Sequence, residues 1–272
     1  MSRPLFAPDS CLVAEVAPSP NQGERKDGRP PDMIVLHYTG MVDSEAALEL
    51  LKARGSDVSA HYFVFEDGRI VQLVQESRRA WHAGKASWAG ETDINSCSIG
   101  VEIANPGYDH GYPDFPKRQI AAVTALCRSI LTRNAVPPVR VLAHSDVAPG
   151  RKQDPGEKFP WRTLYESGVG HWAKPAPIMN FGHVLSPGER GDAVTALQKS
   201  LSEYGYGLEV NAEYDSATGE VVAAFQRHFR PERVDGVADP STRGTLHDLL
   251  ASRGRTRTIA ARARTAMLLV AP

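Results

Sequence analysis

The hydrophobic pattern of the first 170 residues predicts strands that alternate with helices. Residues 33–38 form a continuous apolar run, which is typical of a buried strand. Residues 61–74 contain two β-branched and aromatic runs around Glu-Asp-Gly, which indicates a hairpin. We expect two further strands at residues 97–105 and 139–144. Because a hairpin is antiparallel, the predicted fold is α/β with a mixed central sheet flanked by helices.

Apolar residues at helical spacing predict two helices in the same region. The first covers residues 44–54 and would end at Gly55. The second follows Pro116, which suits a first helical turn. Its apolar stripe consists of Ile120, Val123, Leu126, Cys127, Ile130 and Leu131.

The pattern changes after residue 172, which indicates a second domain. Residues 1–172 would form the first domain with an N-terminal extension, and the proline-rich residues 173–183 a linker. Residues 184–251 carry three short apolar stripes, which predict a three-helix bundle. The stripes are Val194, Leu197, Leu201 and Tyr204; Val221, Val222, Phe225 and Phe229; and Leu246, Leu249 and Leu250.

A weak internal repeat lies within the predicted bundle. NAEYDSAT at residue 211 aligns with DGVADPST at residue 235, an offset of 24 residues. Asp215 and Asp239 are each followed three residues later by Thr, and both suit the N-cap of a helix. The repeat is too short for a solenoid.

Composition and charge exclude several classes of protein. Apolar residues make up 42% of the 272 residues and charged residues 23%, which is typical of a globular protein. The net charge of −1 argues against a nucleic-acid-binding protein, and no stretch approaches the roughly 18 apolar residues of a membrane span. The basic tail, residues 252–272, would be a poorly ordered terminus or a contact for an anionic polymer or membrane.

Cysteine usage and the N-terminus bear on compartment. Cys11, Cys97 and Cys127 are odd in number and widely spaced, which argues against a disulfide framework and a CxxC zinc site. We expect Cys97 and Cys127 to fill core space. The N-terminus lacks an apolar run of about 7–15 residues, so the prediction is a cytoplasmic protein, with the periplasm as the alternative.

Metal-ligand side chains occur where the predicted strands end. His37 closes the first strand, His144 closes the last, and Asp154 follows ten residues later. A lone histidine at such a position is usually structural, but two His and one Asp fit the three protein ligands of a catalytic zinc site. Glu102, in an apolar strand, would be either a member of an ion pair or a general base. Lys152 would be either a solvated lysine or a cation for an oxyanion.

Blocks of sequence between residues 30 and 170 carry a dense resemblance to a known family. They are VLHYTG, SAHYFVFEDGRIVQLV, AWHAG, INSCSIGVEIAN and LAHSDVAPGRKQDPGEKFPW. This region resembles the zinc-dependent N-acetylmuramoyl-L-alanine amidases of the AmpD and AmiD type, relatives of phage lysozyme-amidases and animal peptidoglycan-recognition proteins. The resemblance implies His37, His144 and Asp154 as ligands of a Zn²⁺ cofactor, Glu102 as the catalytic carboxylate and Lys152 as the transition-state cation.

Aromatic residues near these blocks are candidates for substrate binding. The resemblance implies that Tyr62 lies near the site. Trp81 and His82 in AWHAG would line the groove, with a packed loop as the alternative. Tyr108 and Tyr112 would stack on sugar or peptide, and the alternative is a loop pinned by its own rings.

The C-terminal region resembles the peptidoglycan-binding domain found beside wall hydrolases. The blocks are LSPGERGDAVTALQKSLSEYGY, DSATGEVVAAFQRHFRP and VDGVADPSTRGTLHDLL. Ala212-Glu213 replaces the usual glycine turn. Together the two resemblances imply hydrolysis of the amide between N-acetylmuramic acid, or its anhydro form, and L-Ala. The partner would be peptidoglycan or a soluble muropeptide, and the alternative is a recognition protein that binds it without cutting. The oligomeric state stays open.

Overall fold

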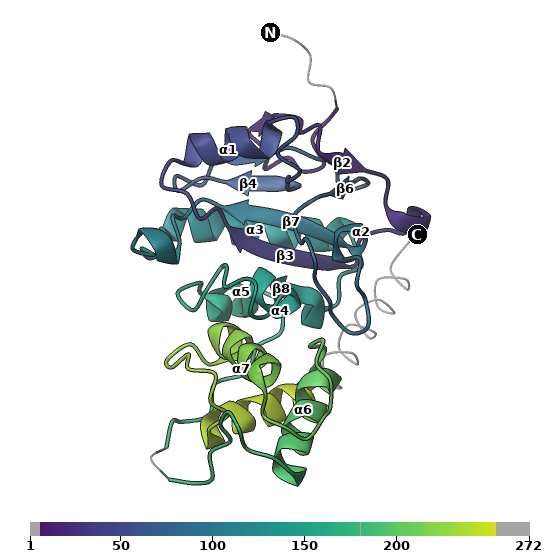
Figure 1. Cartoon of the computed structure of the whole chain (residues 1–272). Coiled ribbons are helices and arrows are strands. Elements are labelled where there is room, and N and C mark those ends of the chain that lie inside the picture. The colour runs from purple at the N-terminus through teal and green to yellow at the C-terminus, as the bar shows by residue number, and fades with distance from the viewer. Residues whose placement is uncertain (1–5, 180, 254–272) are drawn as a thin grey trace, which may run out of the picture.

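The computed structural model describes residues 6–179 and 181–253, and its larger unit is built on a six-stranded mixed sheet (Figure 1). In sheet order the strands are β1 (Glu15–Val16), β5 (Ile70–Gln72), β4 (Tyr62–Val64), β7 (Ser98–Ile103), β3 (Met33–Tyr38) and β8 (Val141–Ala143). β4 and β5 pair antiparallel, whereas β4, β7, β3 and β8 run parallel. The predicted mixed sheet and hairpin are therefore confirmed. A two-stranded antiparallel sheet joins β2 (Gln22–Gly23) to β6 (Arg79–Ala80).

The strand that precedes His144 is shorter than expected. Residues Pro138–Arg140 form the 3-10 helix η3, and the strand covers only Val141–Ala143. His144 begins helix α4 (His144–Val147) because Asp146 Oδ2 accepts a hydrogen bond of 2.8 Å from the Ala143 amide and so caps the turn. The side chain of His144 therefore projects from the first turn of a helix instead of from a strand end.

Helices cover both faces of the sheet. α1 (Ser44–Lys52) begins at Asp43, which accepts hydrogen bonds from two backbone amides of the first turn, and packs on one face with Phe63. α3 (Lys117–Arg133) packs on the opposite face with Tyr62. Both helices were predicted. The remaining short helices are η1 (Lys26–Gly28), α2 (Ile94–Cys97), η2 (Tyr108–His110) and α5 (Trp161–Glu166). Cys97 and Cys127 are fully buried, as expected of core residues.

Three helices form the C-terminal bundle, as predicted. They are α6 (Asp192–Tyr204), α7 (Ser216–Phe229) and a last helix at residues 240–253. Asp215 and Asp239 cap α7 and the last helix by accepting hydrogen bonds of 2.8 and 2.7 Å from the amides of Thr218 and Thr242. Within the described ranges, no helix combines the length and apolar character needed to cross a bilayer.

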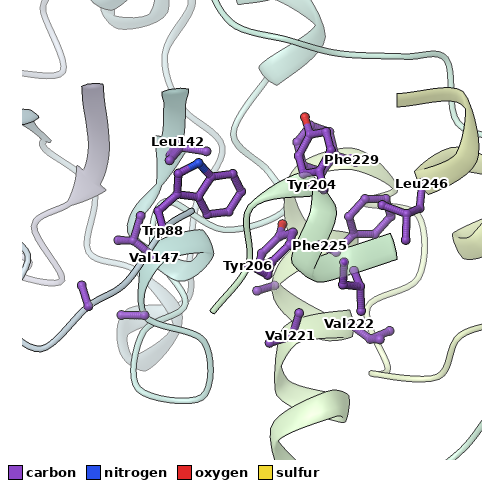
Figure 2. Close-up of a cluster of buried hydrophobic side chains, with 14 of the residues drawn as sticks. Trp88, Leu142, Val147, Tyr204, Tyr206, Val221, Val222, Phe225, Phe229 and Leu246 are labelled. Atoms are coloured by element: carbon purple, nitrogen blue, oxygen red, sulfur yellow. The ribbon is translucent and has the colours of Figure 1, made fainter. Parts of the chain in front are cut away.

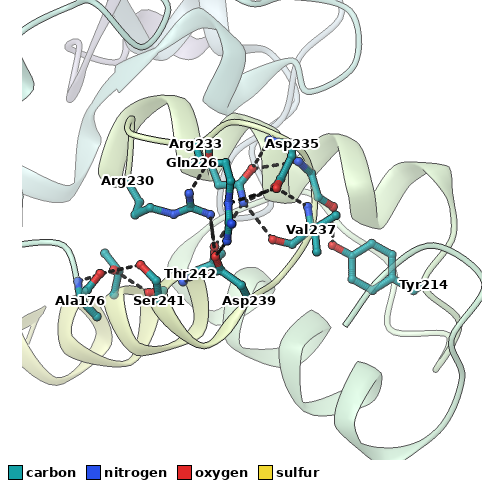
Figure 3. Close-up of polar contacts among 12 residues, drawn as sticks. Ala176, Tyr214, Gln226, Arg230, Arg233, Asp235, Val237, Asp239, Ser241 and Thr242 are labelled. Atoms are coloured by element: carbon teal, nitrogen blue, oxygen red, sulfur yellow. Dashed lines mark hydrogen bonds and ion pairs between the residues drawn. The ribbon is translucent and has the colours of Figure 1, made fainter. Parts of the chain in front are cut away.

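The internal repeat is a repeated hydrogen-bonding unit. The Gln226 amide nitrogen donates to Val237 O and Thr242 Oγ1, and its oxygen accepts from the amide of Gly236 (Figure 3). Gln198 makes the equivalent contacts with Glu213 O, Thr218 Oγ1 and Ala212 N. Each of these three partners lies 24 residues before its counterpart at Gln226. A buried glutamine thus braces each interhelical loop.

The departure at Ala212 keeps the turn but strains it. Ala212 has φ 62° and the equivalent Gly236 has φ 69°, so both occupy the left-handed region. A residue with a Cβ adopts this region at a cost that glycine avoids. The substitution therefore leaves the loop geometry intact at some expense in stability.

The bundle shares a hydrophobic core with the sheet domain. Trp88, Leu142 and Val147 pack in one cluster with Tyr206 and Phe225 of the bundle (Figure 2). α4 and α5 lie between the sheet and the bundle (Figure 1). The predicted linker contains no helix or strand at its described positions, and its Ala176 is bonded to the last helix through Ser241 and Thr245. Most of the basic tail, residues 254–272, lies outside the described residues.

Candidate metal centre and active site

Three buried ligand atoms converge at the carboxyl edge of the sheet. β3 and β8 run parallel side by side, so His37 near the end of β3 and His144 just beyond β8 lie at the same edge. The His37 Nδ1 to His144 Nδ1 distance is 2.9 Å, and Asp154 Oδ2 lies 3.2 Å from the first and 3.0 Å from the second. Zinc bonds of about 2.0–2.1 Å in a tetrahedron place ligand atoms about 3.3 Å apart. The donor set therefore fits a divalent metal.

Hydrogen bonds behind the two histidines fix which ring nitrogen is free to bind a metal. His144 Nε2 lies 3.1 Å from Ala83 O, so Nε2 carries the hydrogen and Nδ1 offers its lone pair. His37 Nε2 lies 3.0 Å from His82 Nδ1, and His82 Nε2 lies 3.0 Å from Ser98 Oγ. Ser98 donates its hydroxyl hydrogen to Ile94 O at 2.6 Å. This chain of donors is consistent only with a hydrogen on His37 Nε2, which leaves its Nδ1 for the metal.

The ionisation of His37 and Asp154 suits metal binding. Burial, with His144 as a second cause, lowers the pKa of His37 to about 4. Burial alone would raise the pKa of Asp154, but the neighbouring His144 and His37 hold it well below its usual range. Neutral imidazoles and an ionised carboxylate are the forms that bind a metal.

Glu102 is a further acidic side chain beside His37 and Asp154. It is the register partner of His37 across β7 and β3, so both side chains lie on the same face of the sheet. Its Oε2 is buried and has no hydrogen-bond partner among the described residues. Burial raises the pKa of Glu102 well above its usual value, and the charge of Asp154 adds to the rise. A carboxylate with a raised pKa is a stronger base, so it can accept a proton from water and later return it.

Lys152 lies close to the same group. Its backbone amide donates to Ala148 O at 3.0 Å, which fixes the loop that leads to Asp154. Its positive charge lowers the pKa of both His37 and Glu102. The five residues that the sequence analysis grouped as candidates therefore lie near one another at one edge of the sheet.

The expectation for Tyr62 is wrong. Tyr62 is the register partner of Val101, whereas Phe63 is the partner of Glu102. Because side chains alternate along a strand, Tyr62 points to the face covered by α3, away from the ligands. It is fully buried, and its hydroxyl donates to Glu76 Oε1 at 2.7 Å.

His82 and Trp81 were both predicted to line a groove, and the structure places them in different surroundings. Both ring nitrogens of His82 are engaged, by His37 and Ser98, so none remains for a substrate. A Cβ on Gly100 would lie 2.4 Å from the His82 ring, so glycine makes room for it. His82 therefore does not line a groove. It orients the ring of His37 instead. The Trp81 ring is half-buried near Gly23, and its backbone is bonded to Ser59.

Tyr112 pins the loop that carries Asp154. Its hydroxyl donates to Pro155 O at 2.7 Å and accepts from the Lys158 amide at 3.0 Å, and the residue is 5% exposed. Stacking on a substrate is therefore wrong for Tyr112, and the alternative of a loop pinned by its own rings holds. Tyr108 is half-buried, and its hydroxyl donates to Glu157.

Sequence reasoning missed residues that hold the site from behind. Arg151 donates to Ala83 O at 2.5 Å, the carbonyl that also orients His144. Ser98 ends the chain of donors behind His37. Asp146 is a fully buried carboxylate two residues after His144. Each contact joins segments that are distant in the chain, so no local pattern announced it.

Comparison with known proteins agrees with this geometry. Residues 27–157 match the family described as N-acetylmuramoyl-L-alanine amidase, and residues 190–246 match the putative peptidoglycan binding domain. AmiD of Escherichia coli K12 is 34% identical over 235 residues, which cover 82% of this chain and 83% of that protein. AmpD of Citrobacter freundii is 34% identical over 173 residues, which cover 56% of this chain and 90% of AmpD.

Solved structures agree over both parts of the chain. E. coli AmiD in complex with anhydro-N-acetylmuramic acid-L-Ala-D-γ-Glu-L-Lys superposes with a TM-score of 0.70 at 35% identity, over 82% of this chain and 90% of AmiD. AmpDh3 of Pseudomonas aeruginosa superposes with a TM-score of 0.69 at 34% identity, over 82% of this chain and 92% of AmpDh3. The resemblance found in the sequence is confirmed: the chain belongs to the N-acetylmuramoyl-L-alanine amidase family and is a hydrolase with a peptidoglycan-binding domain.

Proposed function

We propose that this protein is a zinc amidase that cuts the bond between the lactyl group of N-acetylmuramic acid, or its anhydro form, and L-Ala of the stem peptide. The observation that carries the proposal is the convergence of His37 Nδ1, His144 Nδ1 and Asp154 Oδ2 within 3.2 Å of one another, beside Glu102. These three atoms would hold the metal. When bound, zinc supplies a Lewis acid for the scissile carbonyl and lowers the pKa of a water molecule from 15.7 towards about 7.

Glu102 handles the proton in this proposal. Its unpaired Oε2 takes a proton from the attacking water and returns it to the nitrogen of the departing L-Ala. The raised pKa of Glu102 supports both steps, because a more basic carboxylate takes the proton more readily and holds it until the leaving nitrogen receives it. Lys152 contributes a positive charge where negative charge develops on the carbonyl oxygen.

Two of the candidate substrate contacts remain part of the proposal. The rings of Trp81 and Tyr108 are each half-buried, so each has a surface that a sugar or peptide can contact. Replacing either ring by Ala should raise KM more than it lowers kcat. We also propose that the protein acts in the cytoplasm on released anhydro-muropeptides, with the periplasm as the alternative, and subcellular fractionation tests this.

The alternative function is a recognition protein that binds muropeptides without cutting them. The set of three ligand side chains and Glu102 favour the enzyme, because a binding protein has no need of a buried carboxylate oxygen without a partner beside its metal. The discriminating variant is Glu102→Gln, which keeps the size of the side chain and removes its basic oxygen.

The test measures kcat on a soluble anhydro-muropeptide together with zinc content. Glu102→Gln should lose at least about 100-fold in kcat and keep its zinc, since a general base contributes roughly 10²–10⁴-fold. The matched control is Glu76→Gln, a buried carboxylate on the other face of the sheet, which should keep kcat within about threefold. Loss of zinc in Glu102→Gln would make Glu102 a ligand, and unchanged kcat would end its role as a base.

A further inference from the structure

Helix α4 carries a metal ligand but is too short to hold itself in place. It contains four residues, His144–Val147, and a single turn of helix is unstable in isolation because nucleation costs more than one hydrogen bond returns. Contacts from outside the helix must therefore fix its position. Those contacts also decide where the imidazole of His144 lies.

A shift of α4 would disturb more than one residue of the site. The Ser145 amide donates to Asp154 O at 3.0 Å, so the helix also fixes the backbone of a second ligand. Ala148, which follows the helix, accepts a hydrogen bond of 3.0 Å from the Lys152 amide. The ligand His144, the ligand Asp154 and the cation Lys152 therefore all depend on this one turn.

Asp146 is the residue of α4 that receives polar contacts from outside the helix. Its carboxylate is fully buried and accepts three hydrogen bonds. The Ala143 amide donates to Oδ2 at 2.8 Å and lies in the sheet domain. The other two donors come from the bundle: Tyr206 Oη lies 2.7 Å from Oδ1, and His228 Nδ1 lies 2.6 Å from Oδ2. A buried carboxylate is stable only with such partners.

The two donors from the bundle are themselves held firmly. The ring of His228 stacks on Trp161 of α5 at a centroid distance of 3.7 Å and an interplanar angle of 24°. The ring of Tyr206 meets Trp88 edge-on at 4.9 Å, and Val147 of α4 belongs to the same buried cluster (Figure 2). The bundle therefore presents two fixed donors to one carboxylate of α4.

We propose that the peptidoglycan-binding bundle is part of the metal centre, with Tyr206 and His228 acting through Asp146 as positioning residues for His144. The bundle then serves the reaction on every substrate, including soluble muropeptides that need no tether to the wall. This inference rests on the metal site proposed above. It adds that two residues from outside the amidase domain set the geometry of that site.

The experiment uses the full chain with single substitutions that remove one donor each. Tyr206→Phe deletes only the hydroxyl that reaches Asp146. The matched control is Tyr214→Phe, because the Tyr214 hydroxyl is equally buried and donates at 2.7 Å to Gly236 O within the bundle. His228→Ala removes the second donor, and His228→Asn restores an N–H at about the place of Nδ1. Circular dichroism confirms that each variant is folded at the assay temperature.

Two readouts separate positioning from general stability. The first is zinc affinity, measured by competition with a chelator. Tyr206→Phe and His228→Ala should bind zinc about 10–100-fold more weakly, the range seen when partners behind a metal ligand are lost. Tyr214→Phe should stay within about twofold of wild type, and His228→Asn should recover at least part of the loss. The second readout is hydrogen exchange of residues 143–154 in metal-free protein, which should speed up in Tyr206→Phe and not in Tyr214→Phe.

Wild-type zinc affinity and unchanged exchange in both Tyr206→Phe and His228→Ala would overturn the inference, and so would an equal loss in the Tyr214→Phe control. Failure of the proposed function looks different, because wild-type protein would then bind no zinc. The exchange measurement on metal-free protein would still decide in that case whether the bundle holds α4.

Discussion

Substitution of Trp88 by Ala is expected to destabilise the whole chain. Trp88 belongs to the sheet domain, is 1% exposed and packs against the rings of Tyr206 and Tyr204 in the bundle at 4.9 and 6.1 Å. The adjacent backbone is bonded as well, since the Ala89 amide donates to Gly205 O at 2.7 Å. Trp88 is thus a large, fully buried side chain that contacts both units.

The magnitude follows from the buried surface. A buried Trp removes about 150–250 Å² from water, which corresponds to about 4–6 kcal/mol at about 25 cal/mol per Å². Substitutions of buried Trp by Ala cost about 3–5 kcal/mol. We therefore expect the free energy of unfolding to fall by about 3–5 kcal/mol. The Tm should fall by at least about 6 °C, taking about 2 °C for each kcal/mol in a chain of this size.

The assay is thermal and urea unfolding followed by calorimetry and circular dichroism. The control is Phe63→Ala, because Phe63 is fully buried in the cluster beneath α1 and far from the bundle. If the shared core makes one cooperative unit, both variants shift a single transition. Two separate transitions, with Phe63→Ala moving one of them and Trp88→Ala changing stability by less than about 1 kcal/mol, would refute the reasoning.

Three further predictions concern single residues. Lys152→Ala should lower kcat on a soluble muropeptide by about 100-fold while zinc content stays unchanged; loss of metal would instead make it a support of the ligands. Ala212→Gly should raise the free energy of unfolding by about 1 kcal/mol, because glycine adopts the left-handed φ of 62° without strain. A lower midpoint of urea unfolding than in wild type would contradict the strain. Burial lowers the pKa of His61 to about 3 and of His171 to about 4, so the unfolded chain binds more protons below pH 6.5. Stability should be fully present above pH 6.5 and decrease as the pH falls towards 3; equal urea midpoints at pH 7.5 and 5 would contradict this.

Much of the fold and the ligand set could be predicted from local pattern. The apolar run at Met33–Tyr38 became the buried strand β3, and the stripe after Pro116 became α3. His37 and His144 were grouped because each ends a predicted strand, and the parallel pairing of β3 with β8 is what brings them to one edge. The alternation of side chains in a strand also contained the information that Tyr62 and Glu102 face opposite ways, but only once the register with β7 is known.

The rest depends on contacts between segments far apart in the chain. His82 was expected in a groove from a short motif. That motif does not reveal that Gly100, on strand β7, leaves room for the His82 ring. Asp146 carried no signal, since its partners Tyr206 and His228 lie 60 and 82 residues away. The proline-rich segment at residues 173–183 indicated a linker between two domains, and no local pattern indicated that Trp88 and the bundle share one core. Composition and periodicity do not predict tertiary packing of this kind.

The most direct test of the central claim is a zinc titration of the metal-free protein with cleavage of a soluble anhydro-muropeptide as the readout. If His37, His144 and Asp154 hold one catalytic zinc, activity should rise in proportion to added metal and level off at about one equivalent per chain. His144→Ala should show no such rise. Full activity in protein shown by elemental analysis to be free of metal would contradict the account.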